Sequence, residues 1–311
     1  MKKWYIGVDG GGTKTAAAIS LGDGTPCWIA KRSGCSYQAV GIEAAALTIA
    51  ESMMECLASV GAQLDECAMC CLGIPCCGEN AEQDAAMATE LERLLAPAPL
   101  YIVNDVEVGW AGALDCGPGI HIVAGTGAIA FGKNAKGETA RCGGWDEFFG
   151  DEGSAYWLGR EAMSLFTKQA DGRLPRGPLY GMVKKQLAFT KDMDFIKLIR
   201  SRIAPHRDQV AAFQRIALEA ARAGDEAVIH LYGRAAHELA LMADALKRKL
   251  CLPSPVNVSY SGGVFHADDF ILKPLAEDLA DCGCILQAPV RSALEGALVL
   301  AIQHHKQKEG I

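Results

Sequence analysis

The stretch Ile6-Gly7-Val8-Asp9-Gly10-Gly11-Gly12-Thr13-Lys14-Thr15 places three successive glycines almost directly after the first predicted strand, Trp4–Val8. Adjacent glycines let backbone N–H groups surround a phosphate, and Asp9 supplies a carboxylate where a metal ion could bind. A Walker loop or a dinucleotide fingerprint would continue from its glycines into a helix. Here Gly22-Asp23-Gly24 breaks the chain too soon for a helix, and the spacing matches neither template. The glycines are therefore predicted to form the tip of a β-hairpin.

A second segment repeats this order of strand, glycine turn and returning strand. His121–Ala124 is apolar, Gly125-Thr126-Gly127 is the turn, and Ala128–Gly132 returns. Two such copies, about a domain's length apart, predict a duplicated fold whose hairpins face each other across a phosphate. A branched side chain at Gly11 or Gly127 is expected to block the phosphate without unfolding the protein.

Composition restricts the class of protein. The chain has 311 residues, 50% of them hydrophobic and 22% charged, which is enough for two globular domains with their own cores. The net charge of −7 disfavours a nucleic-acid or anionic-membrane partner. The sequence shows no signal peptide and no apolar stretch long enough to cross a bilayer, so a cytoplasmic protein is expected.

Thirteen cysteines are an unusual number for such a chain, and reduced core residues are the expected role for most of them. Five cluster between residues 67 and 77. Cys70 and Cys71 lie in an apolar strand and should point to opposite faces, while Cys76 and Cys77 are adjacent. Without a second CxxC nearby, this spacing disfavours a structural metal or iron–sulfur site.

The N-terminal part alternates strands and helices, whereas the segment from about 154 to 249 is rich in helices. The domain boundary is expected near Gly117-Pro118-Gly119, as a tight crossover. The predicted strands are Trp4–Val8, Ala16–Leu21, Cys27–Ala30, Cys67–Ile74, Leu100–Val103 and Val256–Tyr260, and the predicted helices include Gly41–Val60, Glu82–Leu95 and Ala293–His305.

Asn104-Asp105 follows the apolar strand Leu100–Val103, at the end where open α/β sheets bind ligands. Taken alone, Asp105 is more simply a cap for a helix beginning at Val106. The two phosphate turns imply a transferable phosphoryl group, and transfer to an alcohol needs a carboxylate that orients and deprotonates the hydroxyl.

The segment from Cys142 to Trp157 contains four acids, four glycines and five aromatic residues. Carboxylates that accept hydroxyl hydrogen bonds, next to an aromatic face, are what a sugar requires. A helix N-terminus would also explain part of it, with Asp151 and Glu152 near the helix dipole and Ser154 as the cap. The two interpretations are compatible.

Ser261-Gly262-Gly263-Val264-Phe265 again follows a predicted strand and precedes a helix. Backbone without side chains could lie flat against an adenine or ribose. A simple strand-to-helix turn explains this stretch equally well.

Together these segments resemble the N-acetylglucosamine kinase and BadF/BadG/BcrA/BcrD-type ATPase family, of the acetate/sugar kinase and actin-like ATPase superfamily. The resemblance extends over the whole chain and is most specific in Gly143-Gly144-Trp145 and in the run Gly150–Trp157. It implies an α/β fold of two ribonuclease-H-like domains, each with a five-stranded mixed sheet, that close over Mg-ATP and an acceptor. The expected domains are 1–118 and 119–291, with a helical insertion in the second and a C-terminal helix, about 292–311, that returns to the first.

The resemblance also implies roles for individual residues. Asp105 would be the catalytic base, and Asp9 would position Mg²⁺. ATP would contact Gly10, Gly11, Gly12, Thr13, Lys14, Gly125, Thr126, Gly127, Gly262, Gly263 and Val264. The sugar would contact Asn104, Gly144, Trp145, Asp151 and Glu152.

Several residues depart from the family pattern where an acceptor would bind. Asp146 stands where a further glycine is common, Ser33–Tyr37 lacks a common asparagine, and Glu107 and Pro75–Glu79 are local variants. These differences leave the ATP-binding residues unchanged and leave the identity of the acceptor open.

The expected activity is an ATP-dependent kinase of an amino sugar or N-acetylhexosamine. The sequence leaves open which sugar and which hydroxyl react, and whether the chain forms a homodimer. The alternatives are an activator of an acyl-CoA dehydratase, whose cysteine pattern Cys142, Cys251, Cys282 and Cys284 do not match, and a non-catalytic ATP-binding regulator.

Overall fold

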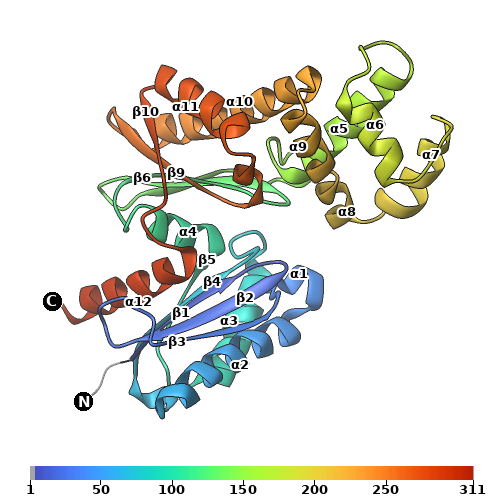
Figure 1. The fold of residues 1–311 in the computed structure, drawn as a ribbon. Coiled ribbons are helices and arrows are strands. Elements are labelled where there is room, and N and C mark those ends of the chain that lie inside the picture. The colour runs from blue at the N-terminus through green and yellow to red at the C-terminus, as the bar shows by residue number, and fades with distance from the viewer. Residues whose placement is uncertain (1–3, 311) are drawn as a thin grey trace. The chain divides into compact units, whose positions relative to one another are not determined.

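The computed structural model describes residues 4–310 and divides into two compact units (Figure 1). Unit 1 comprises the chain through His121 and from Ala288 onwards, and unit 2 comprises Ile122–Gln287. Residues 1–3 and 311 of the expected first domain lie outside the described residues.

Unit 1 contains a five-stranded mixed sheet in the order β3-β2-β1-β4-β5. The first three strands are antiparallel neighbours, whereas β4 runs parallel to both β1 and β5. The predicted mixed sheet is thereby confirmed. Its strands are β1 (Trp4–Gly10), β2 (Lys14–Ser20), β3 (Trp28–Ser33), β4 (Cys67–Ile74) and β5 (Leu100–Asn104).

Helices cover both faces of this sheet (Figure 1). Ile6 and Val8 of β1 share a core with the apolar stripe of α2, while the intervening Gly7 faces α12. A Cβ at Gly7 would lie 2.6 Å from the Leu298 nitrogen, so only glycine allows α12 to pack this closely. The helices are α1 (Tyr37–Val40), α2 (Ile42–Val60), α3 (Ala81–Leu95), α4 (Asp105–Ala113) and α12 (Ala293–Glu309), with a short 3₁₀ turn η1 (Leu64–Glu66).

Unit 2 is built on a second five-stranded sheet, in the order β10-β9-β6-β7-β8, again mixed: β7 and β8 are antiparallel and β9 and β10 parallel. Its strands are β6 (Gly119–Ala124), whose first half precedes the boundary at His121, β7 (Ala128–Lys133), β8 (Thr139–Gly143), β9 (Val256–Ser261) and β10 (Cys284–Gln287).

Unit 2 also carries the predicted helix-rich stretch. Helix α10 packs on β7 and β8 and against α11, and the helices between α5 and α10 form an insertion with its own aromatic core around Phe166. The helices are α5 (Ala155–Ala170), α6 (Pro178–Gln186), α7 (Asp194–Leu198), the π-helical turn η2 (Ile199–Ile203), α8 (Arg207–Ala212), α9 (Gln214–Arg222), α10 (Glu226–Lys249), the 3₁₀ turn η3 (Gly263–Ala267) and α11 (Asp269–Asp281).

The strands of the first hairpin are longer than predicted. The first strand was predicted to end at Val8 and the second to begin at Ala16. In the structure, the pairing of β1 with β2 continues through the pairs Asp9–Ala16 and Gly10–Thr15. Glycine and Thr15 accept extended backbone, so the turn contains only Gly11, Gly12 and Thr13. Asp9 is thereby a strand residue rather than a loop residue.

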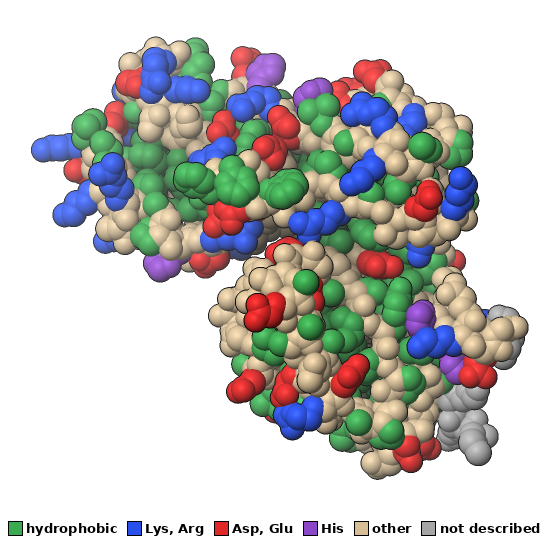
Figure 2. Space-filling model, turned by 180° about the vertical axis from the view of Figure 1, so that it is seen from behind, with side chains coloured by type: hydrophobic (Ala, Val, Ile, Leu, Met, Phe, Trp, Pro, Cys, Tyr) green, Lys and Arg blue, Asp and Glu red, His purple; other side chains and the backbone are tan. Residues whose placement is uncertain are grey.

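All thirteen cysteines are free thiols, and Cys70 and Cys71 are fully buried on β4. Within residues 4–310, no three or more His, Cys, Asp or Glu side chains form a group that could hold a metal ion. In that same range no helix is both long and apolar enough to span a bilayer. On the face in Figure 2, Lys and Arg side chains are interspersed with Asp and Glu.

Candidate active site

The first glycine turn exposes backbone rather than side chains. Gly11 donates to the Lys14 carbonyl at 2.9 Å and accepts from the Cys35 N–H at 3.0 Å, which fixes the turn against the loop after β3. A Cβ built on Gly10 would approach Cys35 Sγ to 2.6 Å, whereas one on Gly12 meets nothing within 4 Å. The turn is therefore packed from behind and open at Gly12, a shape that fits a phosphate against the backbone.

The second turn is attached to the start of α5. Gly125 donates to the Gly127 carbonyl at 2.9 Å, and the N–H groups of Ala155 and Tyr156 donate to the carbonyls of Gly125 and Thr126. A Cβ on Gly125 meets nothing within 4 Å, so this turn is also open. Both hairpins predicted from the glycine turns are thus present.

Gly127, unlike Gly125, is packed against side chains of the acceptor segment and the insertion. A Cβ there would lie 2.7 Å from Asp151 Oδ2 and 2.9 Å from an Arg207 guanidinium nitrogen. A branched residue at Gly127 would therefore have to displace the ion pair between Asp151 and Arg207, a cost that the glycine pattern alone does not reveal.

The predicted adenosine segment packs against the second turn. Gly262 has a φ of 109°, and a Cβ there would lie 2.3 Å from the Ala124 carbonyl oxygen. Gly263 is open, with nothing within 4 Å of an added Cβ. The Val264 side chain is fully buried, so only the backbone of this residue is available to a ligand.

Asp9 and Asp105 meet at one edge of the sheet in unit 1. Asp9, the second-last residue of β1, lies opposite Gly73 of β4, and β4 ends at Ile74 opposite Asn104, the last residue of β5. Burial raises the pKa of Asp105 to about 7, and the charge of Asp9 adds to that shift. Burial also raises the pKa of Asp9, while Lys14 lowers it. A carboxylate whose charge is disfavoured by burial and by a neighbouring acid is typical of a site that takes up a proton or a cation.

The N-cap of α4 is Asn104 rather than Asp105. Its Oδ1 accepts from the Val106 N–H at 3.0 Å and its Nδ2 donates to the Cys77 carbonyl at 2.7 Å. The simple capping role considered for Asp105 therefore belongs to its neighbour. The same two bonds occupy the amide that the sequence predicted would contact a sugar.

The segment between β8 and α5 presents exposed aromatic side chains. Gly143 and Gly144 adopt positive φ angles of 77° and 67°, and Trp145, which follows them, is 71% exposed. Phe148 and Phe149 are exposed as well. At the end of the segment Ser154 accepts from the Trp157 N–H at 3.1 Å, which confirms the predicted helix cap.

Asp151 is the buried acid of this segment, 4% exposed and in the left-handed region at φ 57°. Its Oδ1 accepts from the Ala128 N–H at 3.2 Å, and its Oδ2 pairs with Arg207 at 2.7 Å. Burial raises its pKa, and the Ala128 N–H and the Arg207 charge oppose that rise. Glu152, by contrast, is exposed. The carboxylate predicted to bind a sugar is thus also what joins this segment to the second turn.

Arg207 was missed by the sequence reasoning. It is the first residue of α8 and pairs through Nε with Glu147 at 3.1 Å as well as with Asp151. It lies far along the chain in the helical insertion, and no motif there marks it.

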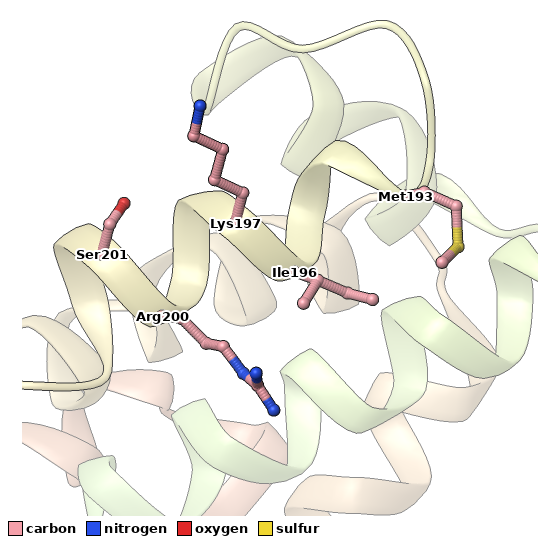
Figure 3. Close-up of a pocket in the computed structure, with 5 residues that line it drawn as sticks. All are labelled: Met193, Ile196, Lys197, Arg200 and Ser201. Atoms are coloured by element: carbon pink, nitrogen blue, oxygen red, sulfur yellow. The ribbon is translucent and has the colours of Figure 1, made fainter.

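A separate hollow on the insertion is lined by Met193, Ile196, Lys197, Arg200 and Ser201 (Figure 3). None of the predicted site residues lines it, and its residues present no convergent catalytic groups. We assign it no role in the site.

The model of the BadF/BadG/BcrA/BcrD ATPase family matches residues 6–297. The chain belongs to this family. As a member of a family of ATPases, it has ATP as its nucleotide.

Individual relatives carry kinase names. An N-acetylmuramic acid/N-acetylglucosamine kinase of Clostridium acetobutylicum is 30% identical over 272 residues, which cover 86% of this chain and 88% of the relative. An N-acetyl-D-glucosamine kinase of Dictyostelium discoideum is 29% identical over 98% of this chain and 99% of its own. A solved structure from Chromobacterium violaceum, assigned as an N-acetylglucosamine kinase, superimposes with a TM-score of 0.75 at 27% identity, covering 97% of this chain and 99% of that one.

Proposed function

We propose that this family member is an ATP-dependent kinase that transfers the γ-phosphoryl group to a hydroxyl of an amino sugar or N-acetylhexosamine. The observation that carries the proposal is the position of Asp105, whose pKa is raised to about 7, within reach of the charge of Asp9 at the end of the sheet that also carries the first glycine turn. The names of the relatives support the choice of acceptor.

In the proposed reaction Asp105 accepts the proton of the acceptor hydroxyl. The hydroxyl oxygen then forms a bond to the γ-phosphorus, the bond from that phosphorus to the β–γ bridging oxygen breaks, and ADP leaves. A base with a pKa near 7 is half ionised at neutral pH and still has driving force to take a proton.

Asp9 would hold Mg²⁺, directly or through water. Mg²⁺ in kinases is bound by one or two carboxylates plus phosphate oxygens and water, and a single carboxylate beside an open glycine turn fits that pattern. When bound with ATP, Mg²⁺ would neutralise charge on the β- and γ-phosphates. Lys14, beside Asp9, would add a second positive charge at the same turn.

The remaining predicted residues would hold the two substrates. The open backbone at Gly12, Gly125 and Gly263 would contact ATP. The exposed face of Trp145 would lie against the C–H surface of the sugar, and Asp151 or Glu152 would accept hydroxyl hydrogen bonds. A cytoplasmic location and a homodimer remain predictions, and light scattering on the purified chain measures the latter.

The test is an ADP-release screen over hexoses, amino sugars, N-acetyl sugars and muramic derivatives, with Mg-ATP present throughout. We expect acceptor-dependent ADP release with at least one amino sugar, and a phosphorylated sugar in the product. ATP hydrolysis that no acceptor stimulates would overturn the assignment. A coloured protein on anaerobic preparation would point instead to the electron-transfer activator.

A further inference from the structure

Arg207 lies beside the predicted acceptor segment but its charge is already compensated there. Its Nε pairs with Glu147 at 3.1 Å and a terminal nitrogen pairs with Asp151 at 2.7 Å. The arginine side chain is 45% exposed, so a ligand in solution can approach it. An arginine in such a position is the ordinary recognition group for a carboxylate.

The two acids differ in what holds them. Asp151 is buried and also accepts the Ala128 N–H, which ties it to the second glycine turn. Glu147 lies on the exposed segment, with 28% of its side chain accessible, and its ion-pair partner among the described residues is Arg207. Asp151 is thus part of the framework, whereas Glu147 is in the position that a ligand carboxylate would otherwise take.

The charge balance around the arginine is negative. Asp146 precedes Glu147 in the same exposed segment, and Glu152 follows Asp151 and is exposed. Against these acids Arg207 is the base that pairs with the segment among the described residues. An acceptor with its own carboxylate would meet net repulsion, whereas an uncharged acceptor would not.

We propose that Glu147 sets acceptor specificity: by pairing with Arg207 it excludes sugars that carry a carboxylate and restricts the enzyme to uncharged hexosamines. The proposal rests on the kinase function proposed above. Because Glu147 would act through its charge, the test must separate the charge of the acceptor from its size. N-acetylmuramic acid is N-acetylglucosamine with a lactyl ether that ends in a carboxylate, and its methyl ester has similar bulk without the charge.

The experiment measures kcat/KM for N-acetylglucosamine, N-acetylmuramic acid and the methyl ester with the wild type and with Glu147→Gln. In the wild type we expect the acid to be used at least about tenfold less efficiently than its ester. Glu147→Gln removes one of the two acids that pair with Arg207, so the ratio of acid to ester should rise about tenfold, equivalent to about 1.4 kcal/mol. Glu147→Ala must move the ratio in the same direction.

Glu161→Gln is the matched control. Glu161 pairs with Arg234 at 3.2 Å in the same unit, so this variant also removes one acid from an exposed ion pair. Its ratio of acid to ester should stay at the wild-type value. Thermal denaturation of each variant checks that the fold is intact.

The outcomes are distinguishable. Equal use of acid and ester by the wild type, or an unchanged ratio in both Glu147 variants, overturns the role of Glu147 while leaving the kinase assignment in place. If N-acetylmuramic acid and its methyl ester are used equally poorly, the size of the lactyl group excludes both, and this result also overturns the role of Glu147. Phosphorylation of none of the three sugars by any variant removes the kinase assignment for this substrate class, and this inference with it.

Discussion

Replacing Asp105 by asparagine should abolish catalysis and stabilise the protein at the same time. Burial and the charge of Asp9 raise the pKa of Asp105 from 3.8 to about 7. A group that binds its proton more tightly in the folded state favours folding only while it is protonated. The contribution of Asp105 to stability is therefore lost as pH rises from about 4 through 7, and the ionised side chain destabilises the native protein at pH 8.

The size of the effect follows from the shift. The rise in the pKa of Asp105 from 3.8 to about 7 corresponds to about 4 kcal/mol of lost unfolding free energy at high pH if solvent does not screen the charge. Because the Asp105 side chain is partly exposed, solvent screens this charge, and we expect ionised Asp105 to cost about 2 kcal/mol of stability. Asp105→Asn removes the charge, so Tm at pH 8 should rise by about 5 °C, with a smaller rise at pH 5. Turnover should fall by about 10²- to 10⁴-fold, while ATP binding stays within a few-fold.

The assay combines ADP release with thermal denaturation at pH 5 and pH 8. Asp65→Asn, an exposed acid in the same unit, is the control and should change neither measurement. Turnover close to the wild-type value would remove Asp105 from the mechanism. A Tm that falls at both pH values would show that the carboxylate supports the fold, and would refute the inference that burial and the charge of Asp9 destabilise ionised Asp105.

Three further measurements test the site. Gly12→Ala should keep the wild-type Tm but weaken ATP binding about tenfold or more, because its Cβ enters the open side of the turn; Gly181→Ala, equally open, should not change ATP affinity. Asp151→Ala should raise the KM for the sugar about ten- to a hundredfold and lower Tm as well, since the buried carboxylate holds an ion pair; a lower Tm with an unchanged sugar KM would assign it to structure alone. The wild-type kcat/KM should fall as pH drops below about 7, because protonated Asp105 cannot take the hydroxyl proton, and a flat profile between pH 5 and 8 would contradict its role as base.

Local sequence signals were sufficient for the hairpins, most element positions and the helix cap at Ser154. Two successive glycine turns flanked by apolar runs have few alternatives to β-hairpins, and a serine that precedes a helical pattern satisfies the free N–H groups of the first turn. The repetition of that order predicted a duplicated fold, and the resemblance to the family implied the fold class of two domains with five-stranded mixed sheets. The end of β1 was predicted too early because glycine is depleted in strands, and here pairing with β2 overrides that preference.

The chemistry of the site depends on contacts between residues distant in sequence. Nothing local raises the pKa of Asp105; the parallel pairing of β1, β4 and β5 brings Asp9 to the same sheet edge, and burial there disfavours the charge. Likewise no motif links Arg207 to Asp151, which lies 56 positions earlier, and only the packing of the insertion brings them to 2.7 Å. Hydrophobic periodicity and turn residues act over a few positions and are visible in the sequence, whereas the electrostatic environment of a buried acid is the sum of all its neighbours and exists only once the chain has folded.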